Sequence, residues 1–234
     1  MTACPVSAAD QRREGAMVAL SKIFFFHIPK CAGTSVWRYL GKIYGHRQMF
    51  QIATGDDVKL FNDMALSSLE DYSVIGGHHF LSTYRDRLGD FEGYYKVTAV
   101  RDPVDRLISF YNFIRRDRKH ARYEQAKNST FEDFSLNEAP NAQTQLLTSG
   151  ESYEEAAQIL DGWFDYYTTT ERADDLMRKL SEIGEVPVRR PLHKNASRKK
   201  VRRDAVDPAL ISRLQQINGA DLRLYEHARD QQFL

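Results

Sequence analysis

The sequence predicts an α/β fold, in which a central parallel sheet is flanked by helices and the C-terminal third is mainly helical. Two observations predict this class. From Lys22 onward, β-rich runs alternate with helix-like segments, and the first and third of these runs lead directly into amphipathic stretches. Such alternation is typical of parallel sheets with helices on both faces. Ligands of these sheets bind at the carboxyl ends of the strands, where loops lead into helices.

Four runs are expected to form the strands. They are "KIFFFHI" (22–28), "YSVIGG" (72–77), "YYKVTAV" (94–100) and "WFDYYTTT" (163–170). Apolar residues recur at three- and four-residue steps in "TSVWRYLGKIY" and "VDRLISFYNFIRR", which predicts a helix after the first and third runs. The aromatic residues of 163–170 would also suit a stacking surface, but their β preference favours the strand.

Three helices are expected in the C-terminal third. The segment 171–184, "ERADDLMRKLSEIG", has acidic residues early, basic residues late and a glycine stop, the polarity that the helix dipole favours. Two further helical pieces are predicted within 207–229, with Pro208 in the first turn of one of them.

The composition is that of an ordinary globular protein. The 234 residues carry 33 Lys and Arg against 32 Asp and Glu, and this balance argues against a chain steered as a whole to nucleic acid or to a membrane. We expect residues 1–20 to form a flexible N-terminal extension and residues 21–234 a single domain. Two cysteines, Cys4 and Cys31, argue against a disulfide framework. With no signal-like apolar segment before Ile23, we expect a cytoplasmic protein.

The loop "PKCAGTS" after the first run predicts an anion site. Its order is P-loop-like without being a Walker A loop, because Lys30 precedes the small residues Ala32 and Gly33. An anionic group is expected at Gly33–Ser35, where a helix begins with free N–H groups, and Lys30 would reach across it. The alternative is a plain strand-to-helix turn with Thr34 or Ser35 as its N-cap.

A second junction of the same kind follows the third run. In "RDPVDRLISFY", Arg101 ends the strand and Ser109 lies two helical turns further on. A guanidinium offers a planar fork to a phosphate, and the serine hydroxyl would donate from the facing side of the helix. Two anion sites on neighbouring strand ends predict a ligand with two separated anionic groups.

Together, "HIPKCAGTS" and "RDPVDRLISFY" resemble the paired signatures of the sulfotransferases that use 3′-phosphoadenosine-5′-phosphosulfate (PAPS) as co-substrate. In particular, they resemble the branch that includes heparan-sulfate 2-O-sulfotransferase and many bacterial relatives. The resemblance spans roughly Lys22 to Glu226, because "NAQTQLLTSG" and "NGADLRLYEHA" also look like family segments. It implies a sulfotransferase-like domain over 21–234 and an enzyme that moves a sulfuryl group to a hydroxyl.

The resemblance also implies roles for individual residues. The 5′-phosphosulfate would be held by the loop residues Lys30, Cys31, Ala32, Gly33, Thr34 and Ser35. Arg101 and Ser109 would hold the 3′-phosphate, and a late loop around "HKNASRKK" would fold over the nucleotide, so that Arg198 or Lys199 completes this site. The chain departs from the family where Cys31 and Ala32 stand in place of the more usual Thr and Gly.

The transfer needs a base with a pKa near neutrality, which favours histidine. His78 and His79 follow the second run and its Gly-Gly turn, on the expected functional edge. The family branch carries its base in a Gly-His segment after a similar strand, which points to His78, with His79 second. His27 lies at the end of the first strand and is expected to orient the loop.

The run "RRPLHKNASRKKVRR" (189–203) holds eight Lys or Arg residues in fifteen and is expected to be a flexible basic loop. Three interpretations stay open: part of the 3′-phosphate site, an attractor for an acidic glycan, or a solvated loop. Nucleic-acid binding is disfavoured because aromatic residues are not interleaved with the basic ones. No His, Cys, Asp and Glu residues have metal-ligand spacing, so no metal is expected.

The sequence thus favours a sulfotransferase whose partner is a hydroxyl-bearing acceptor, a glycan or another small molecule. The first alternative is a P-loop-like kinase of small molecules, against which the position of Lys30 and the lack of a Walker B aspartate count. The second is a non-catalytic nucleotide-binding protein.

Overall fold

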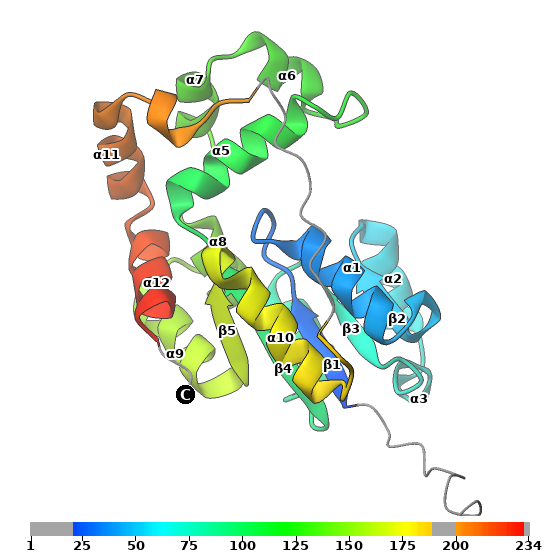
Figure 1. The fold of residues 1–234 in the computed structure, drawn as a ribbon. Coiled ribbons are helices and arrows are strands. Elements are labelled where there is room, and N and C mark those ends of the chain that lie inside the picture. The colour runs from blue at the N-terminus through cyan, green and yellow to red at the C-terminus, as the bar shows by residue number, and fades with distance from the viewer. Residues whose placement is uncertain (1–20, 189–199, 232–234) are drawn as a thin grey trace, which may run out of the picture.

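The protein is built on one parallel sheet (Figure 1). The computed structural model describes residues 21–188 and 200–231, so the extension expected over 1–20 lies outside the described residues. The five strands stand in the order β2-β3-β1-β4-β5, and each neighbouring pair is parallel. They are β1 (Lys22–Phe26), β2 (Met49–Ile52), β3 (Val74–Gly77), β4 (Tyr94–Val100) and β5 (Tyr166–Thr169). The predicted fold class is confirmed, and β2 is a strand that was not predicted.

Twelve α-helices are formed by the described part of the chain. They are α1 (Gly33–Ile43), α2 (Gly55–Asp63), α3 (Leu66–Leu69), α4 (Leu81–Leu88), α5 (Pro103–Ile114), α6 (Tyr123–Asn128), α7 (Phe131–Leu136), α8 (Ala142–Thr148), α9 (Tyr153–Trp163), α10 (Ala173–Ile183), α11 (Pro208–Ile217) and α12 (Gly219–Asp230). The three helices expected in the C-terminal third correspond to α10, α11 and α12, and Pro208 opens α11. None of the helices in residues 21–188 and 200–231 has the length and apolar character needed to cross a bilayer.

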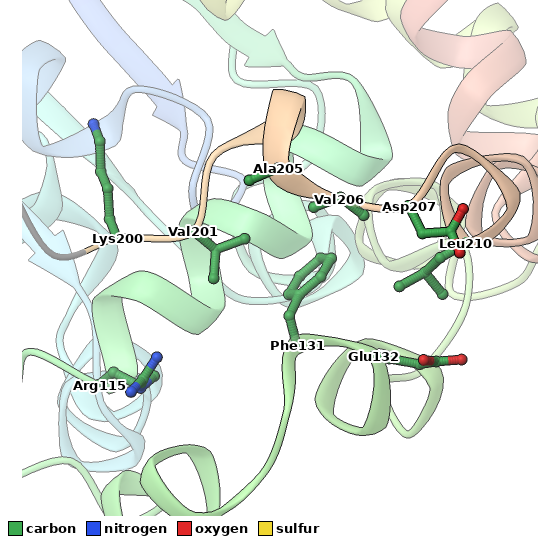
Figure 2. Close-up of a pocket in the computed structure, with 9 residues that line it drawn as sticks. All are labelled: Arg115, Phe131, Glu132, Lys200, Val201, Ala205, Val206, Asp207 and Leu210. Carbon is green, nitrogen blue, oxygen red and sulfur yellow. The ribbon is translucent and has the colours of Figure 1, made fainter.

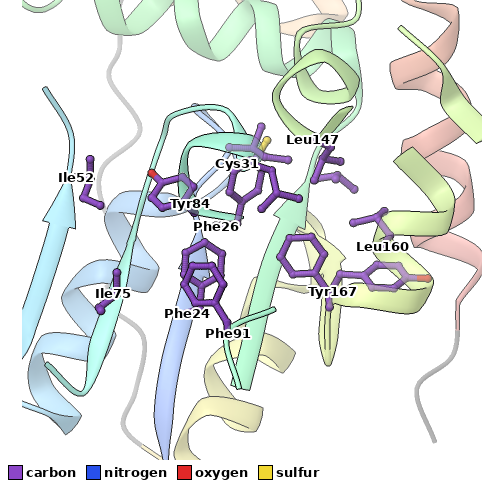
Figure 3. Packing of buried hydrophobic residues seen from close by; sticks show 14 of the residues in the cluster. Phe24, Phe26, Cys31, Ile52, Ile75, Tyr84, Phe91, Leu147, Leu160 and Tyr167 are labelled. Atoms are coloured by element: carbon purple, nitrogen blue, oxygen red, sulfur yellow. The ribbon is translucent and has the colours of Figure 1, made fainter. Parts of the chain in front are cut away.

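The run of apolar residues in β1 is buried on both faces of the sheet, as expected of a central parallel strand. Phe24 and Phe26 pack into a cluster with α4, α8, α9 and α12 on one face (Figure 3). Ile23 and Phe25 pack on the other face, against α1 and α10. Full burial of such a side chain stabilises the fold by about 1.5–3 kcal/mol, so β1 anchors both layers.

A third apolar cluster lies beyond the carboxyl edge of the sheet, where α5, α6, α7 and α11 gather (Figure 1). It is built around residues of α5 such as Leu107 and Tyr111, which pack with Phe134 of α7 and Leu214 of α11. The helix α5 therefore joins the sheet to this separate layer.

The Gly-Gly turn expected before His78 is wrong, because both glycines lie inside β3. A Cβ on Gly76 would lie 2.0 Å from the carbonyl oxygen of Phe25, and one on Gly77 would lie 1.9 Å from that of Ile52. Real Cβ atoms do not approach backbone this closely, so β3 needs glycine to fit between β1 and β2.

We predict that Gly77→Ala lowers the free energy of unfolding by about 1–3 kcal/mol, because the added methyl overpacks the sheet. Urea denaturation measures the loss. Gly162→Ala in α9 is the matched control, since no atom lies within 4 Å of the Cβ added there, and it should stabilise the helix by about 0.5–1 kcal/mol. Equal effects of the two substitutions would contradict this account of β3.

Candidate functional site

The loop between β1 and α1 has an unusual backbone. Lys30 and Ala32 have φ values of 73° and 60°, in the left-handed region that residues with a Cβ rarely adopt. Each such residue costs about 1–3 kcal/mol and persists only where its surroundings hold it. Ala32 occupies the N-cap position of α1 without a side-chain cap, so the alternative of Thr34 or Ser35 as N-cap is wrong.

Three side chains from other elements hold this loop. Arg106 Nε donates to the carbonyl oxygen of Pro29 at 3.1 Å, and Arg101 Nη1 donates to that of Lys30 at 3.1 Å. The thiol of Cys31 donates to the side-chain oxygen of Gln143 at 3.3 Å. Both arginines lie at the β4–α5 junction, so the two predicted anion sites contact each other directly.

Cys31 faces the interior of the protein. Its side chain joins the apolar cluster near Leu147 (Figure 3), and burial raises the pKa of its thiol to about 12. Its backbone N–H donates to the carbonyl oxygen of Ile28 at 3.1 Å. Although the resemblance implies that Cys31 contacts the nucleotide, both of its donors are engaged inside the fold.

Gly33 makes room for a histidine. A Cβ at this position would lie 1.7 Å from Nε2 of His27, so the imidazole packs directly on the first residue of α1. His27 therefore lies under the start of the helix, which agrees with its expected role in orienting the loop. Position 33 therefore requires glycine because of the His27 imidazole, whether or not an anion binds at the start of α1.

Lys30, Arg101 and Ser109 line a single cleft of about 920 Å³. Sequence reasoning from two separate motifs thus selected residues that share one cavity. Seven basic residues line it, namely Lys30, Arg101, Arg115, Arg116, Lys200, Arg202 and Arg203. Among the described residues its acidic lining is Asp105, which is paired with Arg203 at 3.1 Å. The cleft is therefore strongly positive and suited to a multiply charged anion.

The neighbouring positive charges affect the pKa of Lys30. Burial, together with repulsion from Arg116 and Arg101, lowers the pKa of its amine to about 8. Its Nζ lies 4.0 Å from the centroid of the Phe113 ring, a cation–π contact that keeps the amine on the cleft wall. An anion between Lys30 and the arginines would remove this repulsion.

The described end of the basic run forms one wall of the cleft. Val201 exchanges two hydrogen bonds with the side chain of Asn112 in α5, both 2.9 Å long. Arg203 Nη1 lies 2.6 Å from Oδ1 of Asp102, the N-cap residue of α5. The expected flexible loop is thus wrong for residues 200–203, which are docked on α5, whereas Arg198 and Lys199 lie outside the described residues.

A second cavity of about 580 Å³ adjoins the first (Figure 2). Phe131, Val206 and Leu210 form its apolar lining, while Arg115 and Lys200 line both cavities. The segment at 200–201 therefore lines both the basic cleft and this second cavity, whose lining also includes the acidic residues Glu132 and Asp207.

Thr34 lies on the other side of the loop. It is exposed and lines a smaller cavity of about 270 Å³ together with His27, Trp37 and Arg38. Ser35 and Ala32 are half-buried at the start of α1. The loop residues named in the sequence thus face three directions: Lys30 toward the basic cleft, Cys31 toward the core and Thr34 toward this smaller cavity.

His27, His78 and His79 form a chain of imidazoles. The ring centroids of His27 and His78 are 5.6 Å apart, and those of His78 and His79 are 5.7 Å apart. Burial and the neighbouring charges of His78 and Lys30 lower the pKa of His27 to about 4, and burial also lowers the pKa of His78 and His79. All three are therefore neutral at pH 7, the form that accepts a proton.

The histidines stand apart from the basic cleft, whose lining includes none of the three. His27 lies between the two regions, because its ring packs on Gly33 of the Lys30 loop and edge-on against the ring of His78. Buried ring nitrogens, Nδ1 of His27 and His78 and Nε2 of His79, have no hydrogen-bond partner within the part of the chain that the structure describes. In those same residues, no group of His, Cys, Asp and Glu side chains could hold a metal ion.

Sequence reasoning missed several cleft residues. Asn112 lies in α5, and Arg115 and Arg116 follow directly after its last residue, Ile114. All three stand in the stretch "VDRLISFYNFIRR", where their charged and amide groups were the available signal. Gln143 was missed although it lies in "NAQTQLLTSG", because its contacts are made with residues far away in the chain.

The chain is similar to known sulfotransferases in sequence pattern and in fold. The family model described as "Sulfotransferase family" matches residues 17–228. A crystal structure of a sulfotransferase from Alicyclobacillus acidocaldarius is similar with a TM-score of 0.54 and 15% sequence identity, covering 90% of this chain and 97% of that one. Mouse sulfotransferase SULT7A1 complexed with PAP is similar with a TM-score of 0.46 and 10% identity, covering 84% of this chain and 63% of that one. No curated protein matches the chain in sequence.

Proposed function

This chain belongs to the sulfotransferase family, and from that premise we propose that it transfers a sulfuryl group from PAPS to an acceptor hydroxyl. The observation that supports this best is the basic cleft shared by Lys30, Arg101 and Ser109. PAPS carries anionic groups at its 5′ and 3′ positions, so a ligand of this kind meets a basic group at each end.

We assign the 5′-phosphosulfate to Lys30 and the start of α1. Sulfuryl transfer resembles phosphoryl transfer, in which catalysis depends on alignment and on stabilising the charge of the leaving group. As the bond between sulfur and the 5′-phosphate oxygen breaks, negative charge grows on that oxygen, and Lys30 neutralises it. The N–H groups of Gly33 and Thr34 support the same anion through the helix N-terminus, whereas that of Ser35 donates to the carbonyl oxygen of Ala32 at 2.9 Å.

We assign the 3′-phosphate to Arg101 and Ser109. Arg101 is well placed for this role because its backbone is hydrogen-bonded to Gln143 directly after β4 while its side chain lines the cleft. Lys200 and Arg202 line the same cavity, which supports the idea that the basic run closes over this phosphate. The proposed contribution of Arg198 and Lys199 belongs to the same segment.

We assign the base to His78, with His79 as second choice. The acceptor oxygen attacks sulfur, its proton passes to the imidazole, and the 5′-phosphate leaves. A pKa lowered by burial keeps His78 neutral at physiological pH. The resemblance of the motifs to the heparan-sulfate 2-O-sulfotransferase branch supports a carbohydrate acceptor, and other hydroxyl-bearing small molecules belong in the same acceptor panel.

We predict that adenosine 3′,5′-bisphosphate (PAP) stabilises the protein against heat more than ATP or adenosine 5′-monophosphate (AMP) does at equal concentration, because only PAP fills both anion sites. Ser109→Ala should weaken PAP binding by about 1.5–3 kcal/mol and leave AMP binding nearly unchanged. Arg101→Ala, which also removes the hydrogen bond to the Lys30 carbonyl oxygen, should weaken PAP binding more than AMP binding. Isothermal titration calorimetry measures the affinities for PAP and for AMP, and the exposed Arg118→Ala is the charge-matched control for Arg101→Ala. Stronger stabilisation by ATP would favour a small-molecule kinase instead.

Binding of PAP should weaken above pH 8. Lys30 has its pKa lowered to about 8, so it is charged below that pH and loses its proton above it. Because the anion binds the charged form, the Kd should rise by up to about tenfold per pH unit above pH 8. In Lys30→Arg the guanidinium stays charged and this rise should disappear. A Kd that is independent of pH in the unsubstituted protein would exclude Lys30 from the site.

We predict that His78→Ala abolishes sulfuryl transfer and leaves PAP affinity unchanged, because His78 lies outside the cleft lining. In the unsubstituted enzyme kcat/KM should decrease at acidic pH as His78 becomes protonated. The midpoint of this decrease should lie below pH 6.5, the ordinary pKa of histidine, because the pKa of His78 is lowered. Turnover on a panel of hydroxyl acceptors tests this, with His79→Ala in parallel. Full activity of the His78→Ala variant would show that His78 is not the base.

A further inference from the structure

The side chain of Gln143 makes hydrogen bonds to both backbone groups of Arg101. Its Oε1 accepts from the Arg101 N–H at 2.9 Å, and its Nε2 donates to the Arg101 carbonyl oxygen at 2.8 Å. This pattern continues the strand pairing of β4 by one residue, with an amide side chain in place of a neighbouring strand. Gln143 is fully buried, so neither bond competes with water.

The same amide also holds the loop after β1. Oε1 of Gln143 accepts from the thiol of Cys31 at 3.3 Å, next to Lys30. Arg101 in turn donates from Nη1 to the carbonyl oxygen of Lys30 at 3.1 Å. One buried side chain is thus bonded to the two segments that carry Lys30 and Arg101.

Gln143 is itself fixed by two helices that cap each other. Asp221 at the start of α12 accepts from the backbone N–H groups of Gln143 and Thr144, at 3.1 and 2.8 Å, and from the Thr144 hydroxyl at 2.9 Å. In return Asn141 accepts from the N–H groups of Ala220 and Asp221, at 3.0 and 3.2 Å. These contacts join "NAQTQLLTSG" to "NGADLRLYEHA" and leave Gln143 little freedom to move.

We propose that Gln143 is a positioning residue that sets the separation between Lys30 and Arg101, and with it the preference for a nucleotide that carries both phosphates. This inference rests on the proposed function. A ligand held at both ends gains from the second contact only when the two sites stand at the right distance. Loss of the Gln143 amide should therefore reduce the benefit of the 3′-phosphate more than the affinity for the 5′ end.

The test compares the ratio of AMP Kd to PAP Kd in several variants. In Gln143→Met, which keeps the length and loses the hydrogen bonds, the ratio should fall about tenfold, as expected for loss of hydrogen bonds that fix a charged group. Gln145→Met is the matched control on the same helix, because Gln145 bonds to Pro140 and Glu151 instead. It should keep the ratio of the unsubstituted protein.

Gln143→Glu provides a readout that a purely structural role would not give. An ionised glutamate accepts from Arg101 N–H but cannot donate to its carbonyl oxygen, whereas the protonated acid can. Burial raises the pKa of a carboxyl group, and at the adjacent Cys31 thiol burial outweighs the opposing charges of Arg106 and Arg101. The ratio, taken relative to the unsubstituted protein at each pH, should therefore be low at a pH of about 8 and recover toward a pH of about 6.

The outcomes separate the two proposals. If the unsubstituted protein shows no preference for PAP over AMP, the proposed function fails and this inference fails with it. If the preference exists and Gln143→Met retains it, or if Gln145→Met loses it equally, only the positioning role is overturned. Should the methionine variant fail to fold, as judged by circular dichroism, the pH response of Gln143→Glu decides, and a ratio that does not recover at low pH contradicts the role.

Discussion

The pairing of β1 with β4 is the constraint on which the rest of the site depends. The two strands are parallel neighbours, with Phe26 in register with Thr98, so their carboxyl ends open side by side. The segment after each strand carries one half of the cleft, Lys30 after β1 and Arg101 after β4. Without this pairing, two motifs about seventy residues apart in the chain would have no reason to meet.

Holding so many cations together works against the fold, and the structure shows how the repulsion is managed. Asp102 and Asp105 at the start of α5 form ion pairs with Arg203. Arg101 and Arg106 are tied to carbonyl oxygens of the loop. Lys30 is left with a lowered pKa, and its amine lies over the ring of Phe113. An anionic ligand would neutralise the positive charge that remains, and the relief of this repulsion would contribute to the free energy of binding.

Much of the fold follows from local patterns. The apolar run of β1, the amphipathic period of α5 and the stop signal at Gly184 each depend on neighbours in the chain, and all were predicted. The meeting of Lys30, Arg101 and Ser109 in one cleft follows from the general geometry of parallel sheets. Short β2, with only four residues, gives too weak a pattern to be recognised in the sequence.

What could not be predicted depends on contacts between distant residues. Gln143 meets Arg101 and Asp221 across 42 and 78 positions of the chain, and no local pattern marks it. The docking of Val201 on Asn112 spans 89 positions, which is why a basic run looked like a free loop. Likewise, the packing of His27 on Gly33 is visible only in three dimensions.

We propose that one nucleotide lies across the carboxyl ends of β1 and β4. A crystal structure of the protein with bound PAP is the decisive measurement. We expect the 5′-phosphate to lie against Lys30 and the start of α1, and the 3′-phosphate against Arg101 and Ser109. A nucleotide bound in the reverse direction, or with its 3′-phosphate outside the basic cleft, would contradict it.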